Sequence, residues 1–272
     1  MAGTTPPGVL VLDGGMGHLL KSHDIAKFAP HLPPERQFAA AALANAAAPQ
    51  LILSAHVAYI QSAPPLGPSY APLKDMPDNL MEEEYRSLCS AMAEHVDVFL
   101  CETMASIREA HIAAQAARAC GRPVWVAFTL RDAPDPQPQL RSGESLHAAT
   151  KAMLELGVEA ILVNCCSAGA VTAAVRALHT QLAGRNIRIG GYANGFRQTT
   201  DEWLQGRGEM ATNDPADFEP DAAGTAAILP HAYARHAQAW VGAGADIVGG
   251  CCGIGPAHMR VVCEKLKERA DA

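Results

Sequence analysis

The stretch Ala160-Ile161-Leu162-Val163-Asn164-Cys165 is a short apolar run that ends in an amide and a thiol. Similar apolar runs recur along the chain, at residues 9–12, 96–101, 123–130, 187–192 and 245–248. Stretches with helical character lie between them, including residues 105–119, residues 226–241 and a last one that begins near Pro256. Strands that are apolar throughout and alternate with helices predict a parallel sheet with helices on both faces.

Two architectures contain such a sheet: an eight-stranded (β/α)8 TIM barrel and an open, doubly wound sheet. The chemically reactive residues come at the carboxyl ends of widely separated strands: Asp13, Glu102, Cys165, Asn194, Cys251 and Cys252. In a barrel all of these strand ends surround one mouth, whereas in an open sheet they would be spread along an edge. No GxGxxG or Walker A pattern indicates a nucleotide site. We therefore predict an α/β TIM barrel that forms a single domain over residues 1–272.

The predicted barrel has a defect between Asp13 and Val96, where a complete barrel needs two more strands with their helices. Residues 49–61 favour a helix. Residues 62–70 contain three prolines, which cannot donate a hydrogen bond to a neighbouring strand. Because at most one poor strand fits there, we expect a barrel that is missing or distorted at its second β/α unit.

The composition argues against several classes of protein. The 272 residues carry a formal net charge of −7 and scattered lysines and arginines, so we expect no nucleic acid and no anionic membrane as partner. No run approaches the roughly 18 apolar residues of a membrane span. The first residues, MAGTTPPGVL, lack the basic and apolar regions of a secretory signal. We therefore expect a cytoplasmic protein whose eight cysteines are reduced thiols.

Two of these cysteines are adjacent and flanked by glycines, in Gly249-Gly250-Cys251-Cys252-Gly253. Glycine permits the sharp turn that would let both sulfurs face one ion. Cys165 and Cys166 lie far upstream, and one of them could supply a third sulfur. The spacing leaves that choice open, because successive side chains at a strand end point in opposite directions. Three sulfurs favour a soft metal, above all zinc; the alternatives are a buried pair or a disulfide between neighbours.

Zinc with three thiolate ligands and no fourth protein ligand is typical of a catalytic site. Closed structural sites usually come as paired C-x-x-C motifs, which this sequence lacks. A metal with an open position can bind a substrate thiol and lower its pKa, which makes the thiolate a good nucleophile at neutral pH. The cysteine pattern therefore predicts activation of a thiol substrate.

Several motifs, in order along nearly the whole chain, resemble those of the homocysteine S-methyltransferase family. They are Leu12-Asp13-Gly14-Gly15-Met16-Gly17, Phe99-Leu100-Cys101-Glu102-Thr103, Val163-Asn164-Cys165, Tyr192-Ala193-Asn194-Gly195 and the double-cysteine motif with Pro256 and His258. The resemblance implies a (β/α)8 barrel that binds Zn²⁺ through three cysteines and transfers a methyl group to homocysteine, forming methionine. Stand-alone members that use S-methylmethionine or S-adenosylmethionine are most similar in size, and betaine-using members are the next candidates.

The resemblance also implies a set of zinc ligands. The motif residues match Cys165, Cys251 and Cys252, and the asparagine before Cys165 favours it over Cys166. His18 and His258 are not expected to bind the metal, because the three-sulfur set is complete without them.

The same resemblance assigns four residues to the substrate. Asp13 and Gly14 would lie against the amino end of homocysteine, and Glu102 would accept a hydrogen bond from its ammonium. This role fits physical expectation, because an ammonium in a dry barrel mouth needs a carboxylate partner. Asn194 would line the mouth. From the residues alone, Asp13 and Asn194 could instead form turns, and Glu102 could be a carboxylate at a helix amino end.

The chain departs from the family pattern after residue 60. Family members have an apolar strand, a Thr- and Asn-rich turn and another helix before a segment that resembles residues 64–70; here Gln61 runs almost directly into that segment. Either an irregular segment closes the barrel, or a partner chain completes it in a homo-oligomer, or the protein binds zinc with weak or no activity. A thiol redox protein that uses Cys251 and Cys252 is a weaker alternative, because neighbouring cysteines form only a strained disulfide.

Overall fold

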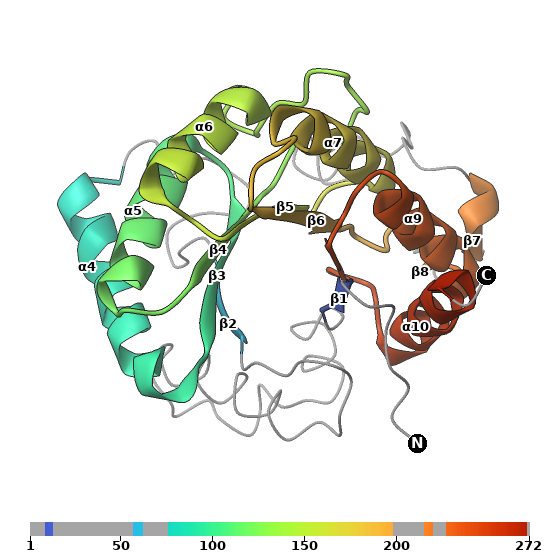
Figure 1. The fold of residues 1–272 in the computed structure, drawn as a ribbon, viewed down its shortest axis with the longest axis horizontal. Helices are drawn as coiled ribbons and strands as arrows, with labels where there is room; N and C mark the ends of the chain where they lie inside the picture. Colours follow the sequence, from blue (N-terminus) through green and yellow to red (C-terminus); the bar gives the residue numbers. More distant parts are fainter. Residues whose placement is uncertain (1–8, 13–56, 62–75, 198–214, 220–226, 271–272) are drawn as a thin grey trace.

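The computed structural model describes residues 9–12, 57–61, 76–197, 215–219 and 227–270. Seven parallel strands of these residues form one sheet in the order β1-β9-β6-β5-β4-β3-β2. They are β1 Leu10–Val11, β2 Val57–Gln61, β3 Val98–Met104, β4 Val124–Phe128, β5 Ala160–Asn164, β6 Arg188–Tyr192 and β9 Ile247–Val248. The strands curve around a common centre, and the helices follow their outer side (Figure 1).

Among the described residues, six helices cover the outside of this sheet: α4 Asp78–Met92, α5 Ile107–Ala119, α6 Leu146–Leu156, α7 Ala168–Gln181, α9 Pro230–Gly242 and α10 Pro256–Ala270. Serine caps begin three of them. The side chains of Ser106, Ser145 and Ser167 each accept a hydrogen bond from the backbone three residues on, which satisfies a donor at the open helix end. Gly157 ends α6 in the left-handed conformation, where glycine avoids the steric penalty of a side chain.

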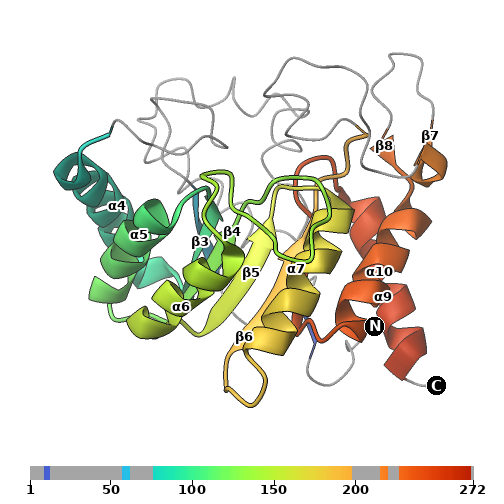
Figure 2. The same cartoon turned by 90° about the horizontal axis from the view of Figure 1, so that it is seen from above.

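Short elements complete the described fold. The 3-10 turn η1 spans Ala93–His95, and η2 spans Pro215–Asp217. Strands β7, Phe218–Glu219, and β8, Ala227–Ile228, form an antiparallel pair beside α9 and α10 (Figure 2). The backbone N–H of Ile228 donates to the oxygen of Gly195, so this pair is attached to the segment that follows β6.

The strand order is that of a barrel, because the first strand lies beside the last. Leu10 pairs with Ile247 and Val11 with Val248. Strands β1 and β2 are the two ends of the order, and each pairs with one other strand among the described residues. The predicted α/β barrel is therefore confirmed as a fold class, with one described strand, β2, between β1 and β3 where a complete barrel has two.

The prediction of a helix through residue 61 is wrong at its carboxyl end. Residues 57–61 form β2 and pair with Val98–Glu102 of β3 in continuous parallel register. A short apolar run does not distinguish helix from strand by periodicity alone, and pairing with β3 decides the outcome here. Strand β2 ends before the three prolines, consistent with their inability to donate to a sheet. The remainder of that predicted helix, residues 49–56, lies outside the described residues.

Both faces of the sheet are buried, and this explains why its strands are apolar throughout. Phe99 and Cys101 pack in the outer core between sheet and helices. Val98 and Leu100, which alternate with them, belong to a second cluster on the inner face. That inner cluster also contains Cys165 and Cys251. Cys165 and Cys251 therefore pack with the apolar side chains on the inner face of the curved sheet.

Candidate metal centre

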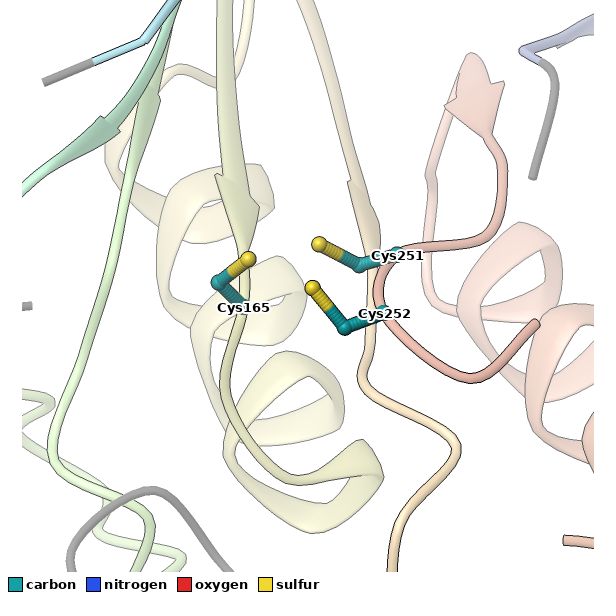
Figure 3. Close-up of side chains that lie close together, drawn as sticks. All are labelled: Cys165, Cys251 and Cys252. Carbon is teal, nitrogen blue, oxygen red and sulfur yellow. The ribbon is translucent and has the colours of Figure 1, made fainter. Parts of the chain in front are cut away.

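Three cysteine sulfurs converge at the carboxyl ends of two strands. Cys165 follows β5, and Cys251 and Cys252 follow β9. Their side chains point toward one another (Figure 3), and the three Sγ atoms all lie within 4.8 Å of one another. Cys165 and Cys251 are buried and Cys252 is half-buried. Within the described ranges, these are the residues that form a cluster of three potential metal ligands.

The backbone makes this convergence possible by turning sharply at both strand ends. Cys165 has a φ of 52°, in the left-handed region that side chains other than glycine rarely adopt. On the other side, Gly253 has a φ of 82°. Gly250 has no room for a side chain, since a Cβ there would lie 2.2 Å from Ile254 Cγ2. The turn predicted from the glycines is thus present around Cys251.

Neighbouring segments hold the double-cysteine turn in place. Cys251 N donates to the oxygen of Ala193 at 3.1 Å, and Gly195 N donates to the oxygen of Cys252 at 2.7 Å. Tyr233, from α9, donates to the oxygen of Gly249 at 2.7 Å and also bonds the backbone of Ala193. Hydrogen bonds therefore connect the segment after β6 to the segment after β9, which carries Cys251 and Cys252.

The thiol set fits zinc. Tetrahedral zinc with Zn–S bonds of about 2.3 Å sets its sulfurs about 3.8 Å apart, which is compatible with the observed cluster. The pKa of Cys251 is raised well above its usual range by hydrogen bonds with Cys165 and Cys252 and by burial. The buried thiols of Cys165 and Cys251 therefore keep their protons unless a cation replaces them, and a set of three sulfurs could hold a soft metal ion.

The choice between Cys165 and Cys166 follows from the left-handed turn at Cys165, which interrupts the alternation of the strand before it. Cys165 belongs to the inner cluster, whereas Cys166 is fully buried in the outer core between sheet and helices. His258 is separate from the sulfurs. Its Nδ1 accepts a hydrogen bond from Gly255 N, and its Nε2 lies 2.8 Å from the oxygen of Ile228.

Glu102 lies within β3, close to the sulfurs, and is only 7 % exposed. Its Oε2 accepts a hydrogen bond of 3.0 Å from the hydroxyl of Tyr192. The pKa of the Cys165 thiol is raised well above its usual range: a hydrogen bond with Cys251 opposes the rise, while a hydrogen bond with Cys252, burial and the charges of Cys252 and Glu102 outweigh it. The alternative of a helix-end carboxylate is wrong, because Glu109, not Glu102, is in the first turn of α5.

The other residues assigned to substrate are only partly described. Asn194 follows β6, is half-buried, and its backbone N–H donates to the oxygen of Cys166 at 3.0 Å. Asp13, Gly14 and His18 lie outside the described residues.

Sequence reasoning missed how Asn164 connects the two halves of the site. Its Oδ1 accepts from Thr103 N at 3.0 Å, and its Nδ2 donates to Thr103 Oγ1 at 2.9 Å. The same Nδ2 lies 3.9 Å from Cys251 Sγ, as a hydrogen bond to sulfur. Thr103 has a φ of 64°, which is an unusual conformation for a β-branched residue. The amide therefore holds a strained turn next to Glu102 while contacting a thiol of the cluster.

The fold and the site together define a barrel-type α/β protein with a thiol centre at the carboxyl ends of its strands. A sequence model described as homocysteine S-methyltransferase matches residues 62–266. The chain therefore belongs to the homocysteine S-methyltransferase family, and this membership supports methyl transfer to homocysteine in general terms.

Solved structures agree on the fold. The apo form of the homocysteine methyltransferase MmuM from Escherichia coli is similar with a TM-score of 0.63 and 19% identity, over 95% of this chain and 96% of that one. Its oxidized form gives 0.64 and 18%, over 96% of both chains. A type I 3-dehydroquinate dehydratase from Clostridium difficile gives 0.50 at 10% identity, over 99% of this chain and 94% of that one. Comparison with curated protein sequences gives no significant match.

No helix among the described residues is long and apolar enough to cross a bilayer.

Proposed function

We propose that this protein transfers a methyl group from a sulfonium donor, S-methylmethionine or S-adenosylmethionine, to the thiol of homocysteine, forming methionine, with a zinc ion held by Cys165, Cys251 and Cys252. The observation that carries the proposal is the convergence of the three sulfurs at the strand ends beside a buried carboxylate. Residues 1–272 would form one domain that acts in the cytoplasm on small molecules.

The three cysteines would hold the metal with one position open. When bound there, the zinc ion supplies a Lewis acid that lowers the pKa of a thiol at that position, so that the thiolate predominates at neutral pH. The inner face of the sheet keeps Cys165 and Cys251 largely away from water. Such a dry setting strengthens electrostatic interactions with the bound substrate.

The remaining chemistry balances without a general acid. A new bond forms between the homocysteine sulfur and the methyl carbon as the carbon–sulfur bond of the donor breaks. The donor leaves as a neutral thioether, and the thiol proton passes to solvent. The protein contributes chiefly by orienting the two substrates in line, which is worth much of the barrier in reactions of this kind.

Glu102 is the group that we propose binds the ammonium of homocysteine. It is nearly fully buried and lies within electrostatic reach of Cys165. A carboxylate in this setting needs charge-compensating partners, and a substrate ammonium would provide one. Tyr192 orients the carboxylate through its hydroxyl. Asp13, Gly14 and Asn194 are proposed to line the rest of the homocysteine pocket.

The test compares zinc content and methionine formation in the protein and in Cys252→Ala. We expect one zinc per chain and methionine from homocysteine and a sulfonium donor, with both lost in the variant. Cys120→Ala is the control, because Cys120 is also half-buried but caps α5 away from the cluster. Equal turnover in Cys252→Ala and the parent protein would refute the ligand assignment.

A second function has an observation in its favour. Strands β1 and β2 each pair with a single strand among the described residues, and the chain has one described strand fewer than a complete barrel. A zinc-binding protein without turnover, acting through association with a second copy or another partner, would fit this. Stoichiometric zinc with no methyl transfer from S-methylmethionine, S-adenosylmethionine or betaine would favour it. Turnover with betaine alone would instead indicate a betaine-using enzyme.

A further inference from the structure

A buried ion pair contacts the backbone of the candidate metal centre at Cys165. Arg141 Nη2 and Asp132 Oδ2 are 3.2 Å apart, and the two side chains are only 3 % and 1 % exposed. Both residues belong to the segment between β4 and α6. Removing two charges from water is costly, and such a pair is often no more stabilising than apolar residues of the same volume. A buried pair in this place therefore calls for a role other than stability.

The pair is bonded to the backbone on both sides of Cys166. Arg141 Nη2 donates to the oxygen of Cys165 at 3.4 Å, and its Nε donates to Thr129 Oγ1 at 3.1 Å. The hydroxyl of Thr129 in turn donates to that same oxygen of Cys165 at 3.2 Å. Asp132 Oδ1 accepts from Ser167 N at 2.6 Å. The carbonyl of Cys165 thus receives two hydrogen bonds, and the residue two positions later is held by the carboxylate.

These contacts act where the β-sheet no longer fixes the backbone. Strand β5 ends at Asn164, and Cys165 takes a left-handed conformation with a φ of 52°. A residue with a side chain keeps such a conformation only when its surroundings impose it. The direction of Cys165 Sγ toward Cys251 and Cys252 depends on this conformation, since the preceding residues alternate in and out of the sheet.

We propose that Arg141, paired with Asp132, is a positioning residue that presets Cys165 to bind the metal. The inference rests on the zinc site proposed above. Arg141 contacts the carbonyl rather than the sulfur, so it acts through Cys165. The planar guanidinium uses separate N–H groups for Thr129, Asp132 and the carbonyl. Lysine, with a single nitrogen on a flexible stem, cannot reproduce that fork.

The experiment measures zinc affinity by competition with a chromophoric chelator. We expect Arg141→Met to raise the Kd for Zn²⁺ about 10- to 100-fold, as for other residues that orient a metal ligand. Arg141→Lys should recover only part of this loss. Arg176→Met, on the exposed face of α7, is the matched control and should leave the Kd unchanged.

The double variant Asp132→Asn/Arg141→Met separates positioning from folding. Removing one partner leaves a buried charge unpaired, whereas removing both does not. The double variant should therefore unfold at a urea concentration close to that of the parent protein, yet bind Zn²⁺ about 10- to 100-fold more weakly. Co²⁺ substitution gives a second readout, because a displaced Cys165 weakens the thiolate-to-cobalt absorption.

The outcomes distinguish this inference from the proposed function. A parent protein that binds no Zn²⁺ would overturn both. A parent protein that binds Zn²⁺ and a double variant whose Kd is within twofold of it would overturn the positioning role alone. Weakened binding in the double variant with normal urea unfolding would support it.

Discussion

The left-handed turn at Thr103 yields the sharpest test of how the site is built. Thr103 lies near the end of β3 and makes two hydrogen bonds with Asn164. It is buried and has a φ of 64°. We predict that Thr103→Gly is more stable than Thr103→Ala. Both substitutions remove the hydroxyl that accepts from Asn164 Nδ2 at 2.9 Å, at a cost of about 1 kcal/mol. In the folded state the two variants differ in the Cβ atom. Alanine retains this atom, which is sterically unfavourable in the left-handed region, and glycine lacks it.

The expected magnitudes follow from this difference. A left-handed conformation costs a residue with a Cβ about 1–2 kcal/mol. Thr103→Ala retains this penalty and loses both the hydrogen bond and the buried γ-methyl, so it should lose about 2 kcal/mol of unfolding free energy. Thr103→Gly has the same losses and a greater freedom in the unfolded chain, but it is relieved of the penalty. We therefore expect Thr103→Gly to unfold about 1 kcal/mol below the parent protein and about 1 kcal/mol above Thr103→Ala.

Urea unfolding of the zinc-free protein, extrapolated to water, measures these free energies. Thr150 provides the control, because it is as buried as Thr103 but lies inside α6. In a right-handed helix the order should reverse, and Thr150→Ala should be more stable than Thr150→Gly by about 1 kcal/mol. If Thr103→Ala proves as stable as Thr103→Gly, the turn is not strained and the role given to Asn164 is wrong.

Three further predictions concern the substrate, the sheet and a buried thiol. Tyr192→Phe removes a hydrogen bond to Glu102, and we expect the KM for homocysteine to rise about tenfold with unchanged zinc affinity, measured by steady-state kinetics and chelator competition. Gly190→Ala would place a Cβ 1.9 Å from a backbone oxygen of β9, so it should not accumulate as folded protein in a solubility and circular dichroism assay. Burial, with a smaller contribution from a neighbouring thiolate and opposed by a backbone hydrogen bond, raises the pKa of Cys89 from 9.0 to about 12. Its contribution to stability is therefore complete below about pH 9 and lost toward pH 12, by about 1.4 kcal/mol per pH unit in urea unfolding.

Each of these has a control. A homocysteine KM in Tyr192→Phe equal to that of the parent protein would argue against Glu102 as the ammonium site. Gly121→Ala has open space around it and should cost only about 1 kcal/mol; equal behaviour of the two alanine variants would contradict the packing argument. Cys89→Ala should lose stability less steeply above pH 9, and an identical slope would exclude the thiol as its source.

Much of the fold could be predicted from local patterns. Six of the seven parallel strands that the structure describes come from runs that are apolar because the sheet is buried on both faces, and this signal needs no knowledge of the partner strands. Residues 57–61 form β2 and not the end of the predicted helix, because these five residues fit a helix equally well until β3 is beside them. Pairing across 41 positions, as between Val57 and Val98, has no local signature.

The candidate site, like the fold, could be predicted only in part from the sequence. The double cysteine, its glycines and Cys165 are chemically distinctive residues, and their positions after strands indicated one end of a barrel. The roles of Asn164, Thr103 and Arg141 could not be predicted, because an amide, a hydroxyl and a guanidinium are common on any surface. Asn164 and Thr103 are 61 positions apart in the sequence. Their hydrogen bonds form because the sheet brings the carboxyl ends of β3 and β5 close together.

The sequence by itself determined the alternation of strands and helices, the family and the thiol character of the candidate metal centre, because apolar periodicity and cysteine chemistry are properties of the residues. Only the tertiary structure decided which sulfurs converge and that Cys165 faces inward while Cys166 packs outward. It also decided that the buried pair of Arg141 and Asp132 is hydrogen-bonded to the backbone of Cys165 and Ser167. The physical reason is that each of these depends on distances between segments remote in the chain, which are set by the packing of the whole sheet.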